Sequence, residues 1–241
     1  MNDIKPSKFE IWIALAAFFA IGIYLLISYL RIGEGFPLDD AWIHQTYARN
    51  LAHLGEWSFI PGEKSGGSTA PLWSVLISIG YLFSDRAFFW TIFLGWVSLS
   101  LTGILGEKII RDNILVPGRK LPFAGIFLVL EWHLVWAAVS GMETILYIAL
   151  ITLIYWMLRK EIKNWGVIGL IIGILVWVRP DAITLLGPVL FVCWLSVPFW
   201  KKRLISCLRV IGSFLTGFIP YLVFNLIISG SAWPNTFYAK Q

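Results

Sequence analysis

Residues 36–73 read FPLDDAWIHQTYARNLAHLGEWSFIPGEKSGGSTAPLW, and this polar stretch interrupts a sequence that is otherwise strongly apolar. Two adjacent carboxylates, Asp39 and Asp40, lie near its start. The apolar run ahead of it, at 11–30, is long enough to cross a bilayer. The stretch therefore separates a first membrane-spanning helix from the rest of the chain, and the membrane face on which it lies decides the topology.

The composition is that of a membrane protein. Apolar residues make up 58% of the 241 and charged residues only 14%, whereas soluble domains have about 45–50% and about 25%. The formal net charge is +5, but the basic residues stand in short loops between apolar runs, which is typical of a topology signal and not of a nucleic-acid-binding protein. The two cysteines, Cys193 and Cys207, lie in or beside apolar segments and show no metal or redox spacing.

The apolar runs predict an all-α polytopic membrane bundle with about seven spanning helices. Lys5 and Lys8 precede the first run, which we interpret as a retained signal anchor with the N-terminus in the cytoplasm. The predicted spans are 11–30, 87–106, 121–139, 142–158, 165–178, 182–200 and 204–228.

A further apolar run, at 71–83, is short for a span and is typical of an interfacial helix. If it does not span, most of the 19 lysines and arginines fall on the cytoplasmic side, as the positive-inside rule favours. The outer face then carries the 31–86 loop, the turns at Glu143 and Arg179, and a tail at 229–241.

Two helices are expected in the 31–86 loop, at 40–54 and 71–83, both lying flat on the outer membrane face. An aspartate at its start can cap the first helix, and Gly55 is suited to end it. The apolar residues that recur at helical spacing, and form one stripe along this helix, are Ile43, Tyr47, Leu51 and Leu54.

The carboxylates allow two interpretations. Asp39 and Asp40 can serve as an N-cap and as partners of the helix dipole, and spacing alone favours this structural role. A carboxylate can also be the base that takes a proton from an acceptor hydroxyl. Glu143, in the SGMET turn at the outer end of the fourth predicted span, is likewise either a helix-terminal charge or a residue of a cavity.

Glu131 and His133 lie inside the third predicted span, where ionisable side chains are expensive and usually functional. We expect them either to face the bundle interior as a functional pair or to form a buried pair whose members satisfy each other.

Three cations on the predicted outer face can neutralise a lipid phosphate. Arg179 stands in an RPD turn, where a snorkelling side chain is the structural alternative. Arg49 lies on the helix that carries the acids, and Lys240 lies in the PNTFYAK tail. His44, on the acid-bearing helix, is a further candidate for substrate contact.

The motifs DDAWI, PGE with GGSTAPLW, SGMET, RPD and PNTFYAK, in this order, resemble the GT-C superfamily of membrane glycosyltransferases, and most closely the group that includes mycobacterial arabinofuranosyltransferases. The resemblance runs from about residue 10 to 241 and implies a single transmembrane module over 1–241. Such enzymes move a sugar, with inversion, from a polyprenyl-phosphate carrier to a hydroxyl of a glycan, lipid or protein at the outer membrane face. Family members are usually longer, so we expect a C-terminal part to be lacking.

The resemblance also implies roles for residues. Asp39, with Asp40 beside it, matches the position of the catalytic acid, and Glu143 matches the second acidic position. Arg179, Arg49 or Lys240 would then neutralise the departing phosphate. The resemblance requires no particular cofactor, but Mg²⁺ or Mn²⁺ held by Asp39 and Glu143 would suit hard oxygen ligands.

Two other functions remain open at this point. A transporter or lipid flippase is the main alternative, and it would show interrupted helices in two related halves, which this sequence lacks. A non-catalytic relative that only binds the lipid carrier is the other. In each case we expect a multi-pass protein of the cell membrane in contact with membrane lipids, with the Asp39 loop outside the cytoplasm and no nucleic-acid partner.

Overall fold

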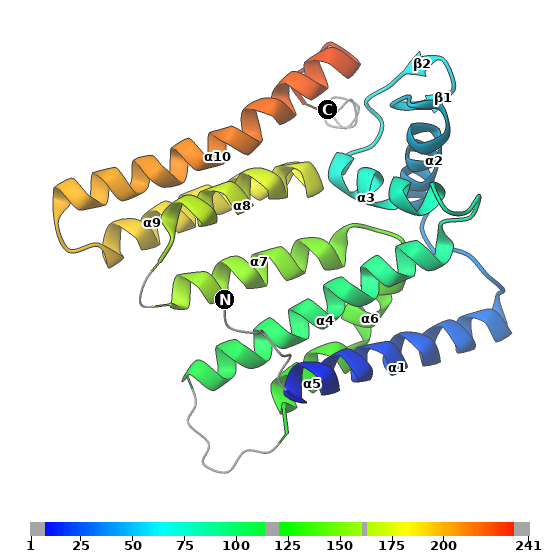
Figure 1. The fold of residues 1–241 in the computed structure, drawn as a ribbon, viewed down its shortest axis with the longest axis horizontal. Helices are drawn as coiled ribbons and strands as arrows, with labels where there is room; N and C mark the ends of the chain where they lie inside the picture. Colours follow the sequence, from blue (N-terminus) through cyan, green and yellow to red (C-terminus); the bar gives the residue numbers. More distant parts are fainter. Residues whose placement is uncertain (1–7, 114–120, 161–162, 234–241) are drawn as a thin grey trace. The chain divides into compact units, whose positions relative to one another are not determined.

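The structure is a computed structural model that describes residues 8–113, 121–160 and 163–233. The regular secondary structure of these residues is helical apart from one small hairpin, which agrees with the predicted all-α class (Figure 1). The chain divides into two compact units, each with its own packed interior. The first unit comprises Met1–Ala41 and Phe88–Arg159, and the second comprises Trp42–Ala87 and Lys160–Gln241.

The first unit is built around one long helix. This helix, α4, packs against the other four helices of the unit, and the indole of Trp96 on α4 donates a hydrogen bond to the Ala14 carbonyl at 2.9 Å. Ile13, Leu99 and Val129 are fully enclosed in the same apolar core. The helices are α1 (Lys8–Arg31), α4 (Phe88–Asn113), α5 (Phe123–Leu130), α6 (Trp132–Val139) and α7 (Thr144–Arg159).

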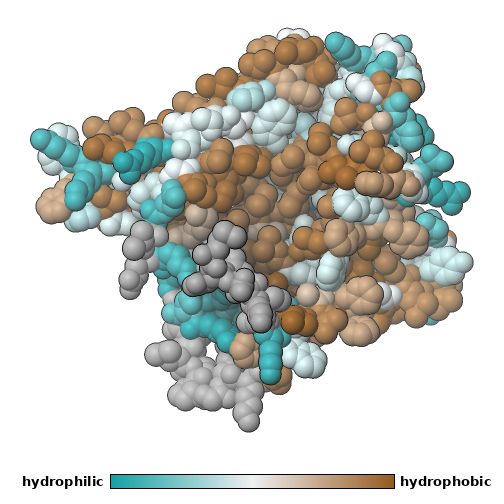
Figure 2. All heavy atoms as spheres, in the orientation of Figure 1, coloured by the Kyte–Doolittle hydropathy of each residue, from teal (hydrophilic) through white to brown (hydrophobic). Residues whose placement is uncertain are grey.

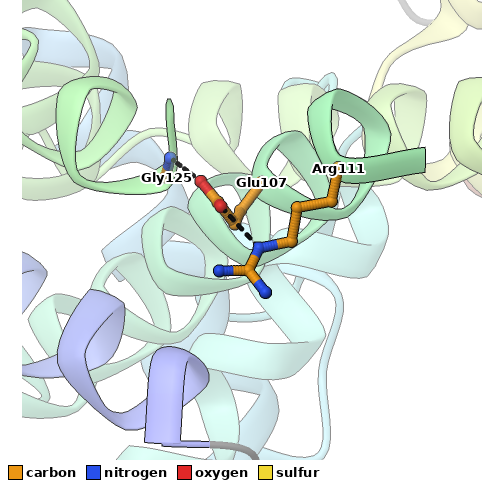
Figure 3. A network of polar contacts seen from close by, with 3 residues as sticks. All are labelled: Glu107, Arg111 and Gly125. Atoms are coloured by element: carbon orange, nitrogen blue, oxygen red, sulfur yellow. Dashed lines mark hydrogen bonds and ion pairs between the residues drawn. The ribbon is translucent and has the colours of Figure 1, made fainter. Parts of the chain in front are cut away.

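A buried carboxylate joins α4 to α5 at one end of this unit (Figure 3). Glu107, only 3% exposed, accepts a hydrogen bond from Arg111 Nε at 2.7 Å and another from the Gly125 backbone N–H at 3.1 Å. Gly125 lies in the first turn of α5, whose N–H groups have no partner within the helix. The Arg111 guanidinium also lies 3.7 Å from the centre of the Phe9 ring. The start of α1, the end of α4 and the start of α5 are therefore held together.

The residues on either side of the 31–86 segment lie close together in the first unit. The ring of Phe36 lies 5.0 Å from that of Phe88, centre to centre. The chain thus leaves the first unit after α1 and returns to it at the same place.

The second unit combines the C-terminal helices, from α8 to α10, with the elements that lie between α1 and α4 in the sequence. Helix α2 begins in the first unit and continues through the second. The elements are α2 (Asp39–Leu54), β1 (Ser58–Ile60), β2 (Glu63–Lys64), α3 (Pro71–Tyr81), α8 (Trp165–Val178), the 3₁₀ helix η1 (Pro180–Leu185), α9 (Leu186–Ser196) and α10 (Trp200–Ser229).

Glycines let α8 and α10 run side by side at close range (Figure 1). A Cβ on Gly169 would overlap the Val210 carbonyl oxygen, and a Cβ on Gly173 would overlap that of Phe214. Small residues allow this kind of backbone approach between membrane helices. Within this unit, apolar residues cover the sides of the long helices, and hydrophilic residues gather at the α9–α10 turn and around α2 and the hairpin (Figure 2).

The structure does not confirm seven spans. In the part of the chain that it describes, α1, α4 and α10 are long and apolar enough to cross a membrane, whereas the remaining apolar helices are shorter. A helix needs about 20 residues to cross the hydrocarbon core. The runs at 142–158 and 165–178 do form helices close to their predicted bounds, as α7 and α8. The run at 182–200 begins as the 3₁₀ helix and ends its α-helix at Ser196.

The run at 121–139 differs most from the prediction, because it forms two helices of eight residues each instead of one span. The break is at Glu131, whose backbone is extended with ψ 124°. Its carboxylate accepts a hydrogen bond from the Leu134 N–H at 2.9 Å and so caps α6. A side chain that satisfies a helix start in this way favours a new helix over a continuous one.

Both helices of the 31–86 loop are present. The bounds predicted at 40–54 and 71–83 are close to those of α2 and α3. Gly55 follows α2 with φ +69°, as expected of a C-cap glycine, and Pro71 is the first residue of α3. The hairpin between them, which turns at Gly62 with φ +85°, was not predicted.

The buried face of α2 differs from its apolar stripe of Ile43, Tyr47, Leu51 and Leu54. Of its four apolar residues only Tyr47 is buried, and Leu54 is 53% exposed. The buried positions include three polar side chains, because the segment that follows the helix supplies partners for them. The buried residues of α2 are Ala41, His44, Gln45, Tyr47, Ala48 and Asn50.

Candidate functional site

The two adjacent acids stand at the beginning of α2. Asp39 and Asp40 are both exposed and both lie in the first turn of the helix. The helix dipole stabilises negative charge at this end, so their position suits the dipole-partner role predicted for them. Their exposure also leaves both carboxylates accessible to a substrate hydroxyl.

The turn that contains the second acidic position packs beside these aspartates within the first unit. Gly141 adopts φ +80°, and a Cβ there would lie 2.7 Å from the Phe36 ring and 2.8 Å from the Ala41 Cβ. Phe36 and Ala41 flank the two aspartates in the chain. Glu143 follows in the same turn, directly ahead of α7, and is 3% exposed. The structure therefore brings an exposed acid pair and a buried acid to one end of the first unit.

The search for metal ligands covers the described residues only. The described parts of the chain contain no group of three or more His, Cys, Asp or Glu side chains that could hold a metal ion. Mg²⁺ can bind through one or two carboxylates together with substrate phosphate, so Asp39 and Glu143 stay a predicted pair of ligands. No step of the mechanism below depends on a metal.

His44, a predicted substrate contact, is enclosed in the second unit with 2% of its surface exposed. Its Nδ1 atom lies 3.2 Å from Ser68 Oγ and 3.1 Å from Ser74 Oγ, and these two hydroxyls are 3.0 Å apart. The imidazole thus ties α2 both to the turn before α3 and to the first turn of α3. A direct contact between His44 and a substrate remains a prediction.

Two further polar side chains of α2 hold the hairpin segment. Asn50 donates from its amide nitrogen to the carbonyls of Ser58 at 2.9 Å and Phe59 at 3.1 Å. The Tyr47 hydroxyl contacts Ser65 and accepts a hydrogen bond from the Gly67 N–H at 2.9 Å. These bonds satisfy backbone groups of a segment that has little regular structure of its own.

Arg49 is exposed on α2, as a residue that binds a lipid phosphate would be. It acts electrostatically on Tyr81 of α3, whose hydroxyl donates to Gln45 Oε1 at 2.9 Å. Burial raises the pKa of Tyr81, and the positive charge of Arg49 opposes part of that rise.

Arg179 lies at the end of α8 with an extended backbone, and its Nε donates to Asp181 Oδ1 at 3.3 Å. Both side chains are substantially exposed, at 40% and 59%. The turn thus holds a local ion pair that was not predicted, and the guanidinium remains partly exposed. Lys240 lies outside the described residues.

The pair predicted in the third span faces outward and not into the bundle. His133 Nδ1 lies 2.6 Å from Glu131 Oε1, and the His133 side chain is 73% exposed. The alternative of a buried pair is therefore wrong, although the two side chains do satisfy each other. Glu131 is committed to capping α6 at the same time.

The sequence predicted neither the hydroxyl partners of His44 nor a cluster of aromatic rings in the second unit. The rings are those of Trp57, Trp177, Tyr221 and Phe224. Ser68 lies in the quoted GGSTAPLW motif and Ser74 directly follows it. Hydroxyl groups close to a buried histidine are candidate hydrogen-bond partners for its ring. Trp57 lies two residues after Gly55, which ends α2. Its ring packs on the Phe224 ring of α10. Nothing in the sequence pairs these two positions.

Among curated proteins, the chain is similar to the terminal β-(1→2)-arabinofuranosyltransferase of Mycobacterium tuberculosis (strain ATCC 25618 / H37Rv). The two are 26% identical over 257 aligned residues, which cover 97% of this chain and 39% of that protein. The chain therefore spans about two fifths of the length of this relative. No family model matches the chain, and no solved structure matches it. The similarity agrees with the resemblance to membrane glycosyltransferases and extends over almost all of the sequence described above.

Proposed function

We propose that this chain is a membrane glycosyltransferase of the GT-C type, which moves a sugar from a polyprenyl-phosphate carrier to a hydroxyl group at the outer membrane face. The observation that carries the proposal is the acid pair. Asp39 and Asp40 are exposed at the start of α2, beside the turn of the buried Glu143, in a chain that aligns over 97% of its length with an arabinofuranosyltransferase.

The chemistry assigned to this site is a single displacement with inversion. Asp39 takes the proton of the acceptor hydroxyl as its oxygen bonds to the anomeric carbon of the donor. The bond from that carbon to the phosphate oxygen breaks, and the phosphate leaves with the electron pair. Positive charge develops on the sugar in the transition state, so the carboxylates of Asp40 and Glu143 also favour it electrostatically. No covalent enzyme intermediate is formed.

Three cations of the sequence, Arg179, Arg49 and Lys240, are the proposed partners of the departing phosphate. Arg179 is the first candidate, because its planar guanidinium matches phosphate geometry and keeps its charge. Its ion pair with Asp181 is exposed, and exposed pairs contribute little free energy. The Asp181 carboxylate is therefore a weak competitor with phosphate for this guanidinium. Arg49 and Lys240 are assigned the same role as secondary candidates.

The name of the relative makes arabinofuranose the first donor sugar to test, carried on a prenyl phosphate. The acceptor is assigned only to the class of glycan, lipid or protein hydroxyls. The proposed orientation has the N-terminus in the cytoplasm and the Asp39 loop outside. An Asp39→Cys variant in whole cells tests this orientation: a thiol reagent that does not cross membranes labels the introduced thiol before lysis if the loop is outside, and only after lysis if it is not.

The decisive experiment measures transfer of radiolabelled arabinofuranose from a prenyl-phosphate donor in membranes. Asp39→Asn retains the shape of the side chain but removes the base, so we expect the rate to fall by about 100-fold or more. Asp85→Asn is the matched control, because Asp85 is an exposed aspartate of the same 31–86 segment.

Equal rates for the wild type and Asp39→Asn would remove Asp39 from the mechanism. If Asp39→Asn and Asp85→Asn lowered the transfer rate equally, the effect would come from surface charge and not from the acid pair. Binding of the donor by the wild type without any transfer would favour the non-catalytic, carrier-binding alternative.

A further inference from the structure

Three consecutive basic residues stand at the start of α10 in the second unit. Lys201 and Lys202 are exposed and Arg203 is partly buried. Figure 2 shows hydrophilic side chains at this end of helices whose sides are apolar. Three exposed aromatic residues stand beside them, between the last turn of α9 and the first residue of α10. We refer to both sets together as the basic–aromatic turn, which consists of Trp194, Phe199, Trp200, Lys201, Lys202 and Arg203.

Each of the three cations lies over one of the three aromatic rings. The distances from cation to ring centre are 5.7 Å for Lys201 over Trp200, 5.4 Å for Lys202 over Phe199 and 5.7 Å for Arg203 over Trp194. Within about 6 Å, the electron-rich face of an aromatic ring attracts a cation. Arg203 Nε also donates to the Val197 carbonyl at 2.6 Å. The rings and this bond therefore position the charged groups at the surface of the turn.

The aromatic rings of the turn are themselves exposed. The exposed fraction is 63% for Phe199 and 65% for Trp200. Tryptophan is enriched where a membrane protein passes from hydrocarbon to water, because its ring suits the level of the lipid headgroups. Lysine and arginine side chains extend from such positions toward the polar side of the interface. Exposed rings beside basic side chains are therefore typical of a surface that meets lipid headgroups.

The protein does not balance the positive charge of the basic–aromatic turn. The sequence has no aspartate or glutamate after Asp181. Within the part of the chain that the structure describes, none of the three cations forms an ion pair. Adjacent cations repel one another, and the dipole of α10 disfavours positive charge in its first turn. An anion from outside the protein removes both costs by contact with the side chains.

The length of α10 separates this turn from the hairpin segment of the same unit. Near the other end of α10, Phe224 packs on Trp57, which follows α2. The helix rises about 35 Å between Lys201 and Phe224, and the hydrocarbon core of a bilayer is about 30 Å thick. A bilayer crossed by α10 therefore has the basic–aromatic turn at one surface and the Trp57 segment at the other.

We propose that the basic–aromatic turn binds the headgroup of an anionic phospholipid, at the membrane surface opposite the hairpin segment. The lipid phosphate accepts hydrogen bonds from the ammonium and guanidinium groups. A zwitterionic headgroup suits the turn less, because its own ammonium group balances the phosphate. The positive-inside rule accounts for basic residues in a loop, but it acts during insertion and requires no ligand in the folded protein. The lipid site does not depend on the proposed sugar transfer.

The test titrates the purified full chain, in a non-ionic detergent, with phosphatidylglycerol or with phosphatidylcholine of the same acyl chains. The unfolding temperature at each lipid concentration gives the concentration of half-maximal stabilisation. We expect this concentration to be lower for phosphatidylglycerol. In Lys201→Gln/Lys202→Gln it should rise about tenfold or more for phosphatidylglycerol, because each basic residue at an anionic surface contributes about fivefold in affinity. It should change little for phosphatidylcholine.

The variant is expected to fold, because both lysines are exposed, so its unfolding temperature without lipid should equal that of the wild type. Lys64→Gln/Arg86→Gln is the matched control: it removes two positive charges from exposed positions elsewhere in the second unit and should leave phosphatidylglycerol binding unchanged. Lys201→Arg/Lys202→Arg keeps both charges and should retain binding. Trp200→Leu keeps the charges but removes a ring, and we expect a loss of about threefold.

Three results would overturn the proposal. The first is the same response to phosphatidylglycerol in the wild type and in Lys201→Gln/Lys202→Gln. The second is an equal loss in the Lys64→Gln/Arg86→Gln control, which would attribute the effect to net charge. The third is equal stabilisation of the wild type by phosphatidylcholine or by inorganic phosphate, because the turn would then not recognise an anionic lipid headgroup.

Discussion

The second unit buries two helix surfaces by opposite means. Between α8 and α10 the contact is made by glycines such as Gly169 and Gly173, and side chains are almost absent from the points of closest approach. On α2 the buried face carries His44, Gln45 and Asn50, and their partners lie in the segment from β1 to α3. The first surface is held by close packing and the second by hydrogen bonds.

The difference reflects what each helix must hold. Two regular helices satisfy their own backbone groups, so close contact between them is sufficient. The 55–70 segment has few internal bonds, and its backbone groups need partners that side chains of α2 supply. Hydrogen bonds are directional, so they also fix the register of this segment along the helix. The face that appears polar in the sequence is therefore the one that positions the loop.

The largest effect is expected from closing the gap between α8 and α10. Gly173→Leu places a side chain where the Phe214 carbonyl lies, and we expect the free energy of unfolding to fall by about 3 kcal/mol or more. Thermal unfolding and size-exclusion profiles in detergent measure the loss. Gly212→Leu on α10 is the control, because a Cβ there meets nothing within 4 Å. Similar behaviour of the two variants would contradict the close α8–α10 contact.

A smaller effect is expected from the polar face. His44→Ala removes the contacts to Ser68 and Ser74 and leaves two buried hydroxyls with fewer partners, at a cost of about 2 kcal/mol. Hydrogen exchange should accelerate at 66–74 more than in α8. His53→Ala, an exposed histidine on the same helix, should change neither. Uniform acceleration over the whole unit would show that His44 supports general stability and does not specifically hold the loop.

The smallest effect is a dependence on alkaline pH at the α2–α3 contact. The pKa of Tyr81 is raised above its ordinary value of 10.0, so its contribution to stability is present below that value and is lost as the pH rises through the folded pKa. Between pH of about 9 and about 11, the unfolding temperature of the wild type should fall more than that of Tyr81→Phe. Arg49→Gln should raise the Tyr81 pKa further, because the opposing charge is gone. Equal pH profiles for wild type and Tyr81→Phe would exclude the effect.

Local signals explain what the sequence could predict. The two aspartates, Gly55 and Pro71 mark helix ends by their own conformational preferences, so the bounds of α2 and α3 followed from residues at or beside those ends. The turn that contains Glu143, directly before α7, was likewise predicted from its own residues, SGMET. The similarity to an arabinofuranosyltransferase supports the resemblance on which the assignment of Asp39 depends.

Features that depend on distant partners could not be predicted. The buried face of α2 carries His44, and no local pattern indicates this, because its hydroxyl partners lie 24 and 30 residues later in the sequence. Mean hydropathy predicted 121–139 as one span, because the hydrogen bond by which Glu131 caps α6 does not change the hydropathy of the segment. The ring of Trp57 packs with those of Trp177 on α8 and Phe224 on α10, which lie far along the chain. No sequence motif or spacing links these positions.

The Tyr47–Gly67 contact carries a consequence for the evolution of this segment. A methyl group at position 67 would stand 2.9 Å from the Tyr47 hydroxyl oxygen, whose removal leaves the nearest ring atom at 3.7 Å. Alanine at position 67 is therefore tolerated in relatives that carry phenylalanine at position 47, and disfavoured in those that keep the tyrosine. The two positions should change together across a set of homologous sequences.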